Sequence, residues 1–187
     1  MAQMLTRLER QPLNIKGLKV TVQPEGKVVF NRGNQDLVVV FDPALLEAVV
    51  ESDILTFSPT GSERLHAQRL GTAISLSRSA IVGLTTGFKV DLEIKGTGFK
   101  VASQVEQGKT VLTFQLGFSN DVKYTLPENV LVKITNPTTF SLESISRQAL
   151  GQVSAQIRRL RKPNRYKGKG IFEKGQVFVL KETKKKK

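Results

Sequence analysis

The residues best suited to a chemical role lie near the C-terminal end of the chain, where cations alternate with an aromatic ring and glycines. The residues of this basic segment are Arg158, Arg159, Arg161, Lys162, Pro163, Arg165, Tyr166, Lys167, Gly168, Lys169, Gly170 and Lys174. Lysine and arginine neutralise phosphates, a tyrosine ring packs on a sugar or base, and glycine lets backbone N–H groups come close to a phosphate. The combination predicts contact with a folded RNA through its backbone, its shape and its unpaired bases.

The net charge of the chain, +13, is concentrated in the same region. Residues 1–146 carry 15 Lys and Arg against 14 Asp and Glu, whereas residues 147–187 carry 14 against two. Cations in the last turn of a helix interact favourably with its dipole, which explains one or two of them. A positive run that continues from Pro163 to Lys174 repels itself and indicates a polyanionic partner. A merely solvated tail is the alternative, and it suits Lys184–Lys187 better than the segment before them.

The composition argues against several other classes of function. Cysteine is absent, which excludes disulfides, thiolate nucleophiles and cysteine-ligated zinc, and a single histidine, His66, excludes a multi-histidine metal site. We expect His66 to be a surface residue beside Arg64 and Arg69. No apolar run reaches the ~18–20 residues that span a bilayer, and Met1–Pro12 lacks the apolar block of a secretory signal. We therefore expect no metal, no cofactor, no membrane and no small-molecule substrate.

Two glycine-containing motifs resemble nucleotide-binding signatures, but the residues around them do not match those signatures. Gly96-Thr97-Gly98 lacks the third glycine of a dinucleotide fingerprint, and strand-forming residues follow where a helix should begin. We predict a bulge or tight turn between two strands there. Lys167-Gly168-Lys169-Gly170 has neither the spacing nor the Ser or Thr of a phosphate-binding loop of nucleotide hydrolases.

Asp91 and Glu93 are the one carboxylate pair that could be proposed for catalysis. They project from the same face of a predicted strand, but Lys89 and Lys95 share that face. The pattern favours a mutually neutralised surface in water. A hydrolase that uses these carboxylates is kept as one alternative function, and a protein-interaction module that uses neutral sheet faces is kept as another.

An internal repeat with an offset of about 80 residues indicates how the chain is organised. Four matches occur in the same order: Gly17-Leu18-Lys19-Val20 with Gly98-Phe99-Lys100-Val101, Gly26–Phe30 with Gly108–Phe114, Leu37–Phe41 with Val122–Leu126, and Gln68-Arg69-Leu70-Gly71 with Gln148-Ala149-Leu150-Gly151. The chain is therefore predicted to be a duplicated module, with domains at 1–84 and 85–162 and a basic C-terminal extension at 163–187.

Each module is predicted to place strands before one helix, which is an α+β fold with a small, mainly antiparallel sheet packed on the helix. The predicted strands are 18–22, 27–31, 37–41 and 54–57 in the first module, and 89–95, 99–105, 110–116, 121–125 and 130–135 in the second. The predicted helices are 63–81, capped by Ser62, and 142–161, capped by Ser141 or by Ser144. Their apolar stripes, expected to face the sheets, are Leu65, Leu70, Ala73, Ile74 and Ile81, then Leu142, Ile145, Ala149, Val153, Ile157 and Leu160. Six phenylalanines are expected in the core or on sheet faces: Phe30, Phe41, Phe57, Phe99, Phe114 and Phe118.

The run from Pro163 to Ile171 resembles protein six of the large ribosomal subunit, of the bacterial and organellar type, whose members show Pro-Glu-Pro-Tyr-Lys-Gly-Lys-Gly at this place. The likeness extends to Gly96-Thr97-Gly98-Phe99, Leu116-Gly117-Phe118-Ser119, Gly151-Gln152 and the lysine-rich terminus. It implies a duplicated α+β fold without enzymatic activity. It also implies binding to large-subunit rRNA near the sarcin–ricin loop and the base of the factor-recruiting stalk, with ribosomal proteins as neighbours. Pro163, Tyr166, Lys167, Gly168, Lys169 and Gly170 match the family motif, and the resemblance implies that they contact the RNA or shape the contact.

The chain departs from the family pattern in three places. Asn164 and Arg165 replace Glu-Pro, which adds a positive charge and removes a rigid turn. The residues after Gly170 differ from the usual aromatic and acidic continuation, and the N-terminus keeps only Arg7 and Pro12 of the usual pattern. The resemblance implies a ribosome in the bacterial cytoplasm, a mitochondrion or a plastid, and does not choose among them.

Overall fold

The structure is a computed structural model that describes residues 12–106 and 108–182. The chain divides between Gly87 and Phe88 into two compact units. The N-terminal arm with Arg7 and the solvated lysines predicted at Lys184–Lys187 lie outside the described residues. No helix in the described part of the chain is long and apolar enough to cross a membrane.

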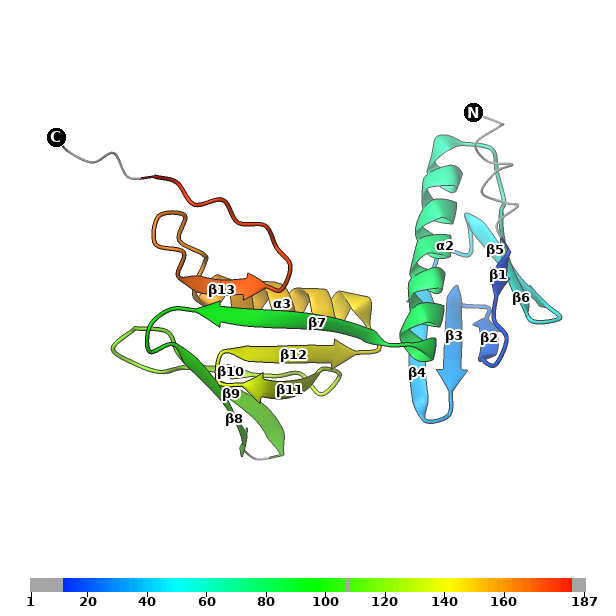
Figure 1. The fold of residues 1–187 in the computed structure, drawn as a ribbon. Coiled ribbons are helices and arrows are strands. Elements are labelled where there is room, and N and C mark those ends of the chain that lie inside the picture. Colours follow the sequence, from blue (N-terminus) through cyan, green and yellow to red (C-terminus); the bar gives the residue numbers. More distant parts are fainter. Residues whose placement is uncertain (1–11, 107, 183–187) are drawn as a thin grey trace. The chain divides into compact units, whose positions relative to one another are not determined.

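The first unit packs a helix on short antiparallel strands (Figure 1). Its elements are β1 (Leu13–Asn14), β2 (Lys19–Gln23), β3 (Lys27–Arg32), β4 (Gln35–Val40), β5 (Leu46–Glu51), β6 (Ile54–Pro59) and α2 (Arg64–Thr85). The strands form two three-stranded sheets with the orders β2-β3-β4 and β1-β6-β5. β-Branched and apolar residues that alternate along β3 and β6 bury one face of each strand, as a sheet packed on a helix requires.

Helix α2 confirms the predicted helix of the first unit but differs at both ends. Its N-cap residue is Glu63, which makes no side-chain capping bond, so the prediction of Ser62 as the cap was wrong. Leu70 and Ile74 are buried against the sheets as expected, whereas Leu65, in the first turn, is 45% exposed. The helix therefore turns its apolar stripe to the sheets only from its second turn onward.

The second unit contains a four-stranded sheet, a three-stranded sheet and a helix (Figure 1). Its elements are β7 (Phe88–Lys95), β8 (Lys100–Glu106), β9 (Lys109–Gln115), β10 (Val122–Thr125), β11 (Leu131–Asn136), β12 (Thr139–Ser144), α3 (Arg147–Leu160) and β13 (Gly170–Glu173). The sheet orders are β11-β12-β7-β13 and β10-β9-β8. One core joins both sheets to α3, and Leu92, Phe114, Phe140 and Ile157 are completely buried in it.

Two corrections concern the second unit. Ser141 and Leu142 belong to β12, which pairs with β11 on one side and with β7 on the other, so the predicted helix start at Leu142 was wrong. The helix begins at Arg147, and the hydroxyl of Ser146 accepts a hydrogen bond from the N–H of Ala149 at 3.3 Å. The cap is therefore Ser146, and the prediction of Ser141 or Ser144 as the cap was also wrong. The run from Phe140 to Leu142 is buried on both faces of β12, and such a strand lacks the alternation that distinguishes a strand from a helix.

The two units repeat the same order of elements. Sheet β2-β3-β4 corresponds to β8-β9-β10, the strands β5, β6 and β1 correspond to β11, β12 and β7, and α2 corresponds to α3. Gly17 and Gly98, matched in the sequence repeat, both adopt a positive φ, 78° and 74°, before their strands. The topology therefore agrees with the α+β fold and the duplication predicted from the sequence, and the tight turn predicted at Gly96-Thr97-Gly98 lies between β7 and β8.

Strand β13 has no counterpart among the described strands of the first unit. It pairs antiparallel with β7, placing Ile171 opposite Ile94 and Phe172 opposite Glu93. Ile171 is completely buried and Phe172 is 5% exposed. Part of the segment assigned from sequence to a C-terminal extension is thus a strand of the second unit's sheet.

Candidate nucleic-acid interface

The basic segment begins at the end of α3 and forms a short loop that returns to the sheet as β13 (Figure 1). Asn164 organises this loop. Its side-chain oxygen accepts hydrogen bonds from the N–H groups of Tyr166 at 2.8 Å and Lys167 at 3.0 Å. Its N–H donates to the carbonyl of Lys169, and its carbonyl accepts from the N–H of Gly168, both at 2.9 Å. The loop is therefore closed by its own backbone and one amide side chain.

The base of the loop is closely packed. The N–H of Ile171 donates to the carbonyl of Arg161 at 3.0 Å. Gly170 is buried with φ 146°, and a Cβ atom there would lie 2.8 Å from the Cα of Pro163. Gly168 has φ 65° and faces Leu180. Both glycines thus pack against the chain's own atoms, and the N–H of Gly168 is already donated to the carbonyl of Asn164.

The cations of the basic segment fall into two groups. Arg158 lies 3.3 Å from Glu173 through its guanidinium, and the guanidinium of Arg161 lies 4.6 Å from the ring centre of Phe118. The others are exposed, and none has a carboxylate within ion-pair distance among residues 12–106 and 108–182; they are Arg159, Lys162, Arg165, Lys167, Lys169 and Lys174. Their charge is left uncompensated within the described part of the chain.

Tyr166 lies at the tip of the loop with 58% of its surface exposed. The chain after β13 runs back beside the loop, where the N–H of Lys181 donates to the carbonyl of Arg165 at 2.9 Å. Phe178 packs edge-on against Phe172 with ring centres 5.2 Å apart. The loop and the returning chain therefore lie side by side.

Three contributors to this surface were not predicted. Asn164 was treated only as a departure from the family motif, although asparagine commonly hydrogen-bonds the backbone two residues later and so forms turns. Phe118 was expected in the core or on a sheet face, but it is 46% exposed and contacts Arg161. Lys181 lies 12 residues after Lys169 in sequence, so only the folded return of the chain brings it to the loop.

The carboxylate pair does not form a catalytic arrangement. Asp91 lies 3.6 Å from Lys89, and Glu93 lies 3.4 Å from Lys95, as predicted for a mutually neutralised surface. Together with Lys174 they border a shallow hollow of ≈ 430 Å³. No group of three His, Cys, Asp or Glu residues in the described ranges could hold a metal ion.

His66 is half-buried rather than freely exposed. Its ring lies against Gly61, and its Nδ1 atom is inaccessible to solvent without a hydrogen-bond partner in the described structure. It is remote in sequence from the basic segment, and it belongs to the first unit.

The sequence is similar to those of known proteins over nearly its whole length. Residues 96–186 match the family model described as ribosomal protein L6. The chain is similar to "Large ribosomal subunit protein uL6" of Spiroplasma citri, at 33% identity over 96% of this chain and 98% of that protein. It is 34% identical to the protein of the same description in Cellvibrio japonicus, over 97% of this chain and all of the other. The protein so described in Legionella pneumophila strain Corby is 38% identical over 73% of this chain and 74% of its own length.

Proposed function

The chain belongs to the ribosomal protein L6 family, and from this membership we propose that it is a structural constituent of the large ribosomal subunit that binds large-subunit rRNA through its basic segment. In this proposal the chain has no catalytic role. It supports translation by holding folded rRNA.

One observation supports RNA as the partner more than any other. Six exposed cations lie along the segment from the last turn of α3 to the residue after β13, and no carboxylate of the described residues lies within ion-pair distance of them. Like charges held this close repel each other unless an anion lies between them. A phosphate backbone supplies such anions at regular spacing, and rRNA is the polyanion of the ribosome.

Different residues of the basic segment have different roles in this proposal. We assign phosphate neutralisation to the exposed cations Arg159, Lys162, Arg165, Lys167, Lys169 and Lys174, and packing on a sugar or base to Tyr166. Pro163, Gly168 and Gly170 shape the loop. Arg158 and Arg161 join the loop to the sheet and to Phe118 while adding positive potential. Recognition then depends on RNA shape rather than on base sequence.

The proposal also includes a position within the ribosome. We propose that the contact lies near the factor-binding region, the sarcin–ricin loop and the base of the stalk, with ribosomal proteins as neighbours, as the family resemblance implies. The relatives reported above are bacterial, which supports a ribosome in the bacterial cytoplasm. A mitochondrial or plastid ribosome is the alternative. Detection of the native protein in fractionated cells would show which compartment contains it.

The test is binding of the full chain to deproteinised bacterial large-subunit rRNA over a range of salt concentrations. The logarithm of the binding constant should fall with the logarithm of salt by about 0.7–0.9 per phosphate neutralised. The double variant Lys167→Ala/Lys169→Ala should bind more weakly, and its slope should be smaller by roughly 1.4–1.8. Lys100→Ala/Lys133→Ala, which removes two exposed cations outside the segment, is the matched control. Equal slopes for the two double variants would remove the segment from the interface.

Co-sedimentation separates this function from the two alternatives. A structural constituent of the large subunit should remain with that subunit through a sucrose gradient at moderate salt. A protein-interaction module that uses neutral sheet faces would stay near the top of the gradient. A hydrolase that uses Asp91 and Glu93 would lose activity when both are replaced, whereas rRNA binding should be nearly unchanged by Asp91→Asn/Glu93→Gln.

A further inference from the structure

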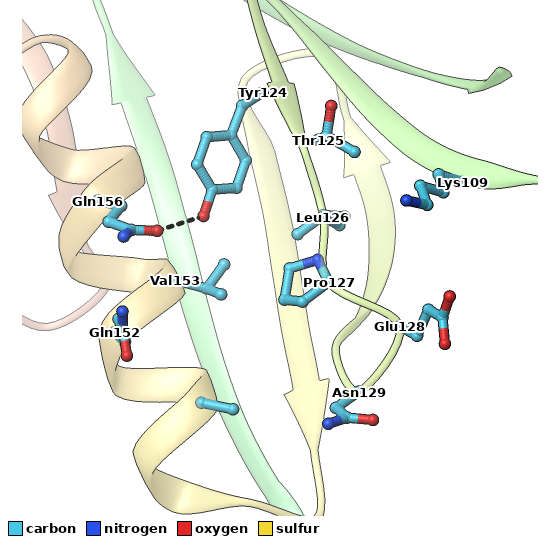
Figure 2. Close-up of a pocket in the computed structure, with 11 residues that line it drawn as sticks. Lys109, Tyr124, Thr125, Leu126, Pro127, Glu128, Asn129, Gln152, Val153 and Gln156 are labelled. Atoms are coloured by element: carbon cyan, nitrogen blue, oxygen red, sulfur yellow. Dashed lines mark hydrogen bonds between the residues drawn. The ribbon is translucent and has the colours of Figure 1, made fainter. Parts of the chain in front are cut away.

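A second candidate site lies in the second unit, on the side of α3 away from β13. A groove of ≈ 670 Å³ runs between α3 and the segment that joins β10 to β11 (Figure 2). Gln152 and Gln156 form the wall on α3, and Tyr124 and Pro127 lie on the other side. The volume falls within the ~300–1,000 Å³ that is usual for small-ligand sites.

The lining combines an apolar floor with neutral polar groups. Leu126 and Val153, each 3% exposed, contribute to the floor. The hydroxyl of Tyr124 donates to the Oε1 atom of Gln156 at 2.6 Å, which leaves the amide NH₂ of Gln156 to donate elsewhere. The side chains of Gln152 and Asn129 make no hydrogen bond to any other described residue. Burial raises the pKa of the Tyr124 phenol above its ordinary value.

This chemistry matches a nucleobase. A base presents a flat apolar face together with donors and acceptors at its edge, and amide side chains supply both kinds of partner. Unpaired bases of RNA are bound by proteins in this way, on apolar or aromatic surfaces with hydrogen bonds at the edge.

The charge around the groove connects it to the basic segment. Arg159 lies seven residues after Gln152 and three after Gln156, so these side chains project on the same side of α3. The distance from Gln152 to Arg159 along the helix axis is about 10 Å. Lys109 lies at the opposite rim, and Glu128 is the one carboxylate among the residues that line the groove. An RNA strand that leaves Arg159 can therefore enter the groove within a few nucleotides.

We propose that the groove between α3 and the β10–β11 segment holds an unpaired nucleotide of the same rRNA that the basic segment binds. This inference rests on the proposed function. It adds a neutral subsite that binds the edge of a base to an interface that otherwise contacts phosphates and, through Tyr166, a sugar or base. The side chains of Gln152 and Gln156 bind the edge of the base, and its face lies on the apolar floor.

The first experiment compares Gln152→Ala/Gln156→Ala with wild type in binding to deproteinised bacterial large-subunit rRNA. The groove variant should bind roughly tenfold more weakly, as expected for loss of one bound base. Its dependence on salt should keep the wild-type slope, because no charge is removed. Gln148→Ala, an exposed glutamine on α3 that does not line the groove, is the matched control and should bind as wild type does.

The salt dependence of binding tests the nucleotide subsite and the rRNA interface at the loop separately. Wild-type affinity in the groove variant would overturn the nucleotide subsite, while the lysine variants of the loop still test rRNA binding. Failure of the loop variants to alter the slope would overturn the proposed interface at the loop. Tyr124→Phe keeps the ring and removes the hydroxyl that holds Gln156, so it should weaken binding severalfold even if the double variant folds poorly.

A second measurement identifies the occupant directly. Ultraviolet cross-linking of assembled large subunits, followed by mass spectrometry, should recover a nucleotide attached to the peptide that contains Tyr124. Recovery of a nucleotide on the Tyr166 peptide but not on the Tyr124 peptide would overturn the subsite. A cross-link from Tyr124 to a ribosomal protein would instead make the groove a protein-docking surface and would also refute the proposal.

Discussion

A Cβ atom on Gly170 would lie 2.8 Å from the Cα of Pro163, because the first residue of β13 packs directly against the third residue after the end of α3. The same atom would lie 2.9 Å from the Pro163 nitrogen and 3.0 Å from the carbonyl oxygen of Arg161. All three neighbours are backbone atoms, so they cannot move aside as a flexible side chain would. The loop of the basic segment therefore depends on glycine at its base for steric reasons.

Gly170→Ala should destabilise the second unit by about 2–3 kcal/mol, since it adds a clash with backbone to a positive φ of 146°. Gly175→Ala is the control, because Gly175 also has a positive φ but has open space at its Cβ; it should cost only about 1 kcal/mol. Urea denaturation of both variants measures the difference. Equal losses of unfolding free energy in the two variants would show that the backbone around Pro163 can move to accommodate a Cβ atom.

Gly71→Ala and Gly151→Ala should each stabilise the chain by about 0.5–1 kcal/mol. Both glycines lie inside helices, α2 and α3, and an added Cβ atom would meet nothing within 4 Å. Alanine has the higher helix propensity because it restricts the unfolded chain more than glycine does. A rise in the urea midpoint at unchanged slope is expected, and a fall for either variant would show a steric constraint that the structure does not contain.

Ile171→Ala should cost about 2–4 kcal/mol, because Ile171 is completely buried between β7 and α3 in the core of the second unit. Val177→Ala, six residues later, should stay within about 0.5 kcal/mol of wild type because Val177 is 89% exposed. Thermal unfolding of the two variants tests whether β13 belongs to the folded core. If Ile171→Ala proves as mild as Val177→Ala, the strand is not integrated in solution.

Asn164→Ala should weaken rRNA binding severalfold without altering its salt slope. The substitution removes the acceptor that holds the N–H groups of Tyr166 and Lys167, so the loop must be ordered on binding. No charge is lost, so the number of phosphates neutralised stays the same. Asn164→Asp keeps the acceptor and should restore loop order, and its added negative charge should lower the slope instead.

Glu173→Gln should tighten rRNA binding at low salt while changing stability by less than about 1 kcal/mol. The ion pair of Glu173 with Arg158 is partly exposed, with side chains 45% and 33% accessible, so its own contribution to folding is small. Removal of the carboxylate frees the guanidinium for phosphate. Glu106→Gln, at the far end of β8 and paired with Lys123, should leave binding unchanged. Identical salt curves for the two variants would exclude Arg158 from the interface.

The sequence by itself determined the features that depend on local composition and on repetition. The concentration of cations from Arg147 onward, the internal repeat and the turn at Gly96–Gly98 are all visible in it, and the family assignment followed from the motif at Pro163–Gly170. Strands β1, β5, β12 and β13 were not predicted. Most predicted strands lie within a residue or two of those observed, because their ends are marked by glycine, proline and asparagine.

The tertiary structure decided the features that depend on contacts between residues far apart in sequence. Leu142 belongs to a strand because β7 and β11 flank it, and no pattern within Thr139–Ser144 contains that information. The return of β13 to β7, some 77 residues apart in pairing, made Gly170 a packing residue rather than an exposed one. The same pairing brings Glu173 to Arg158, with which it forms an ion pair, whereas Lys167 and Lys169 remain exposed. Composition specifies which charges exist, but only the folded path of the backbone determines which of them remain available to a partner.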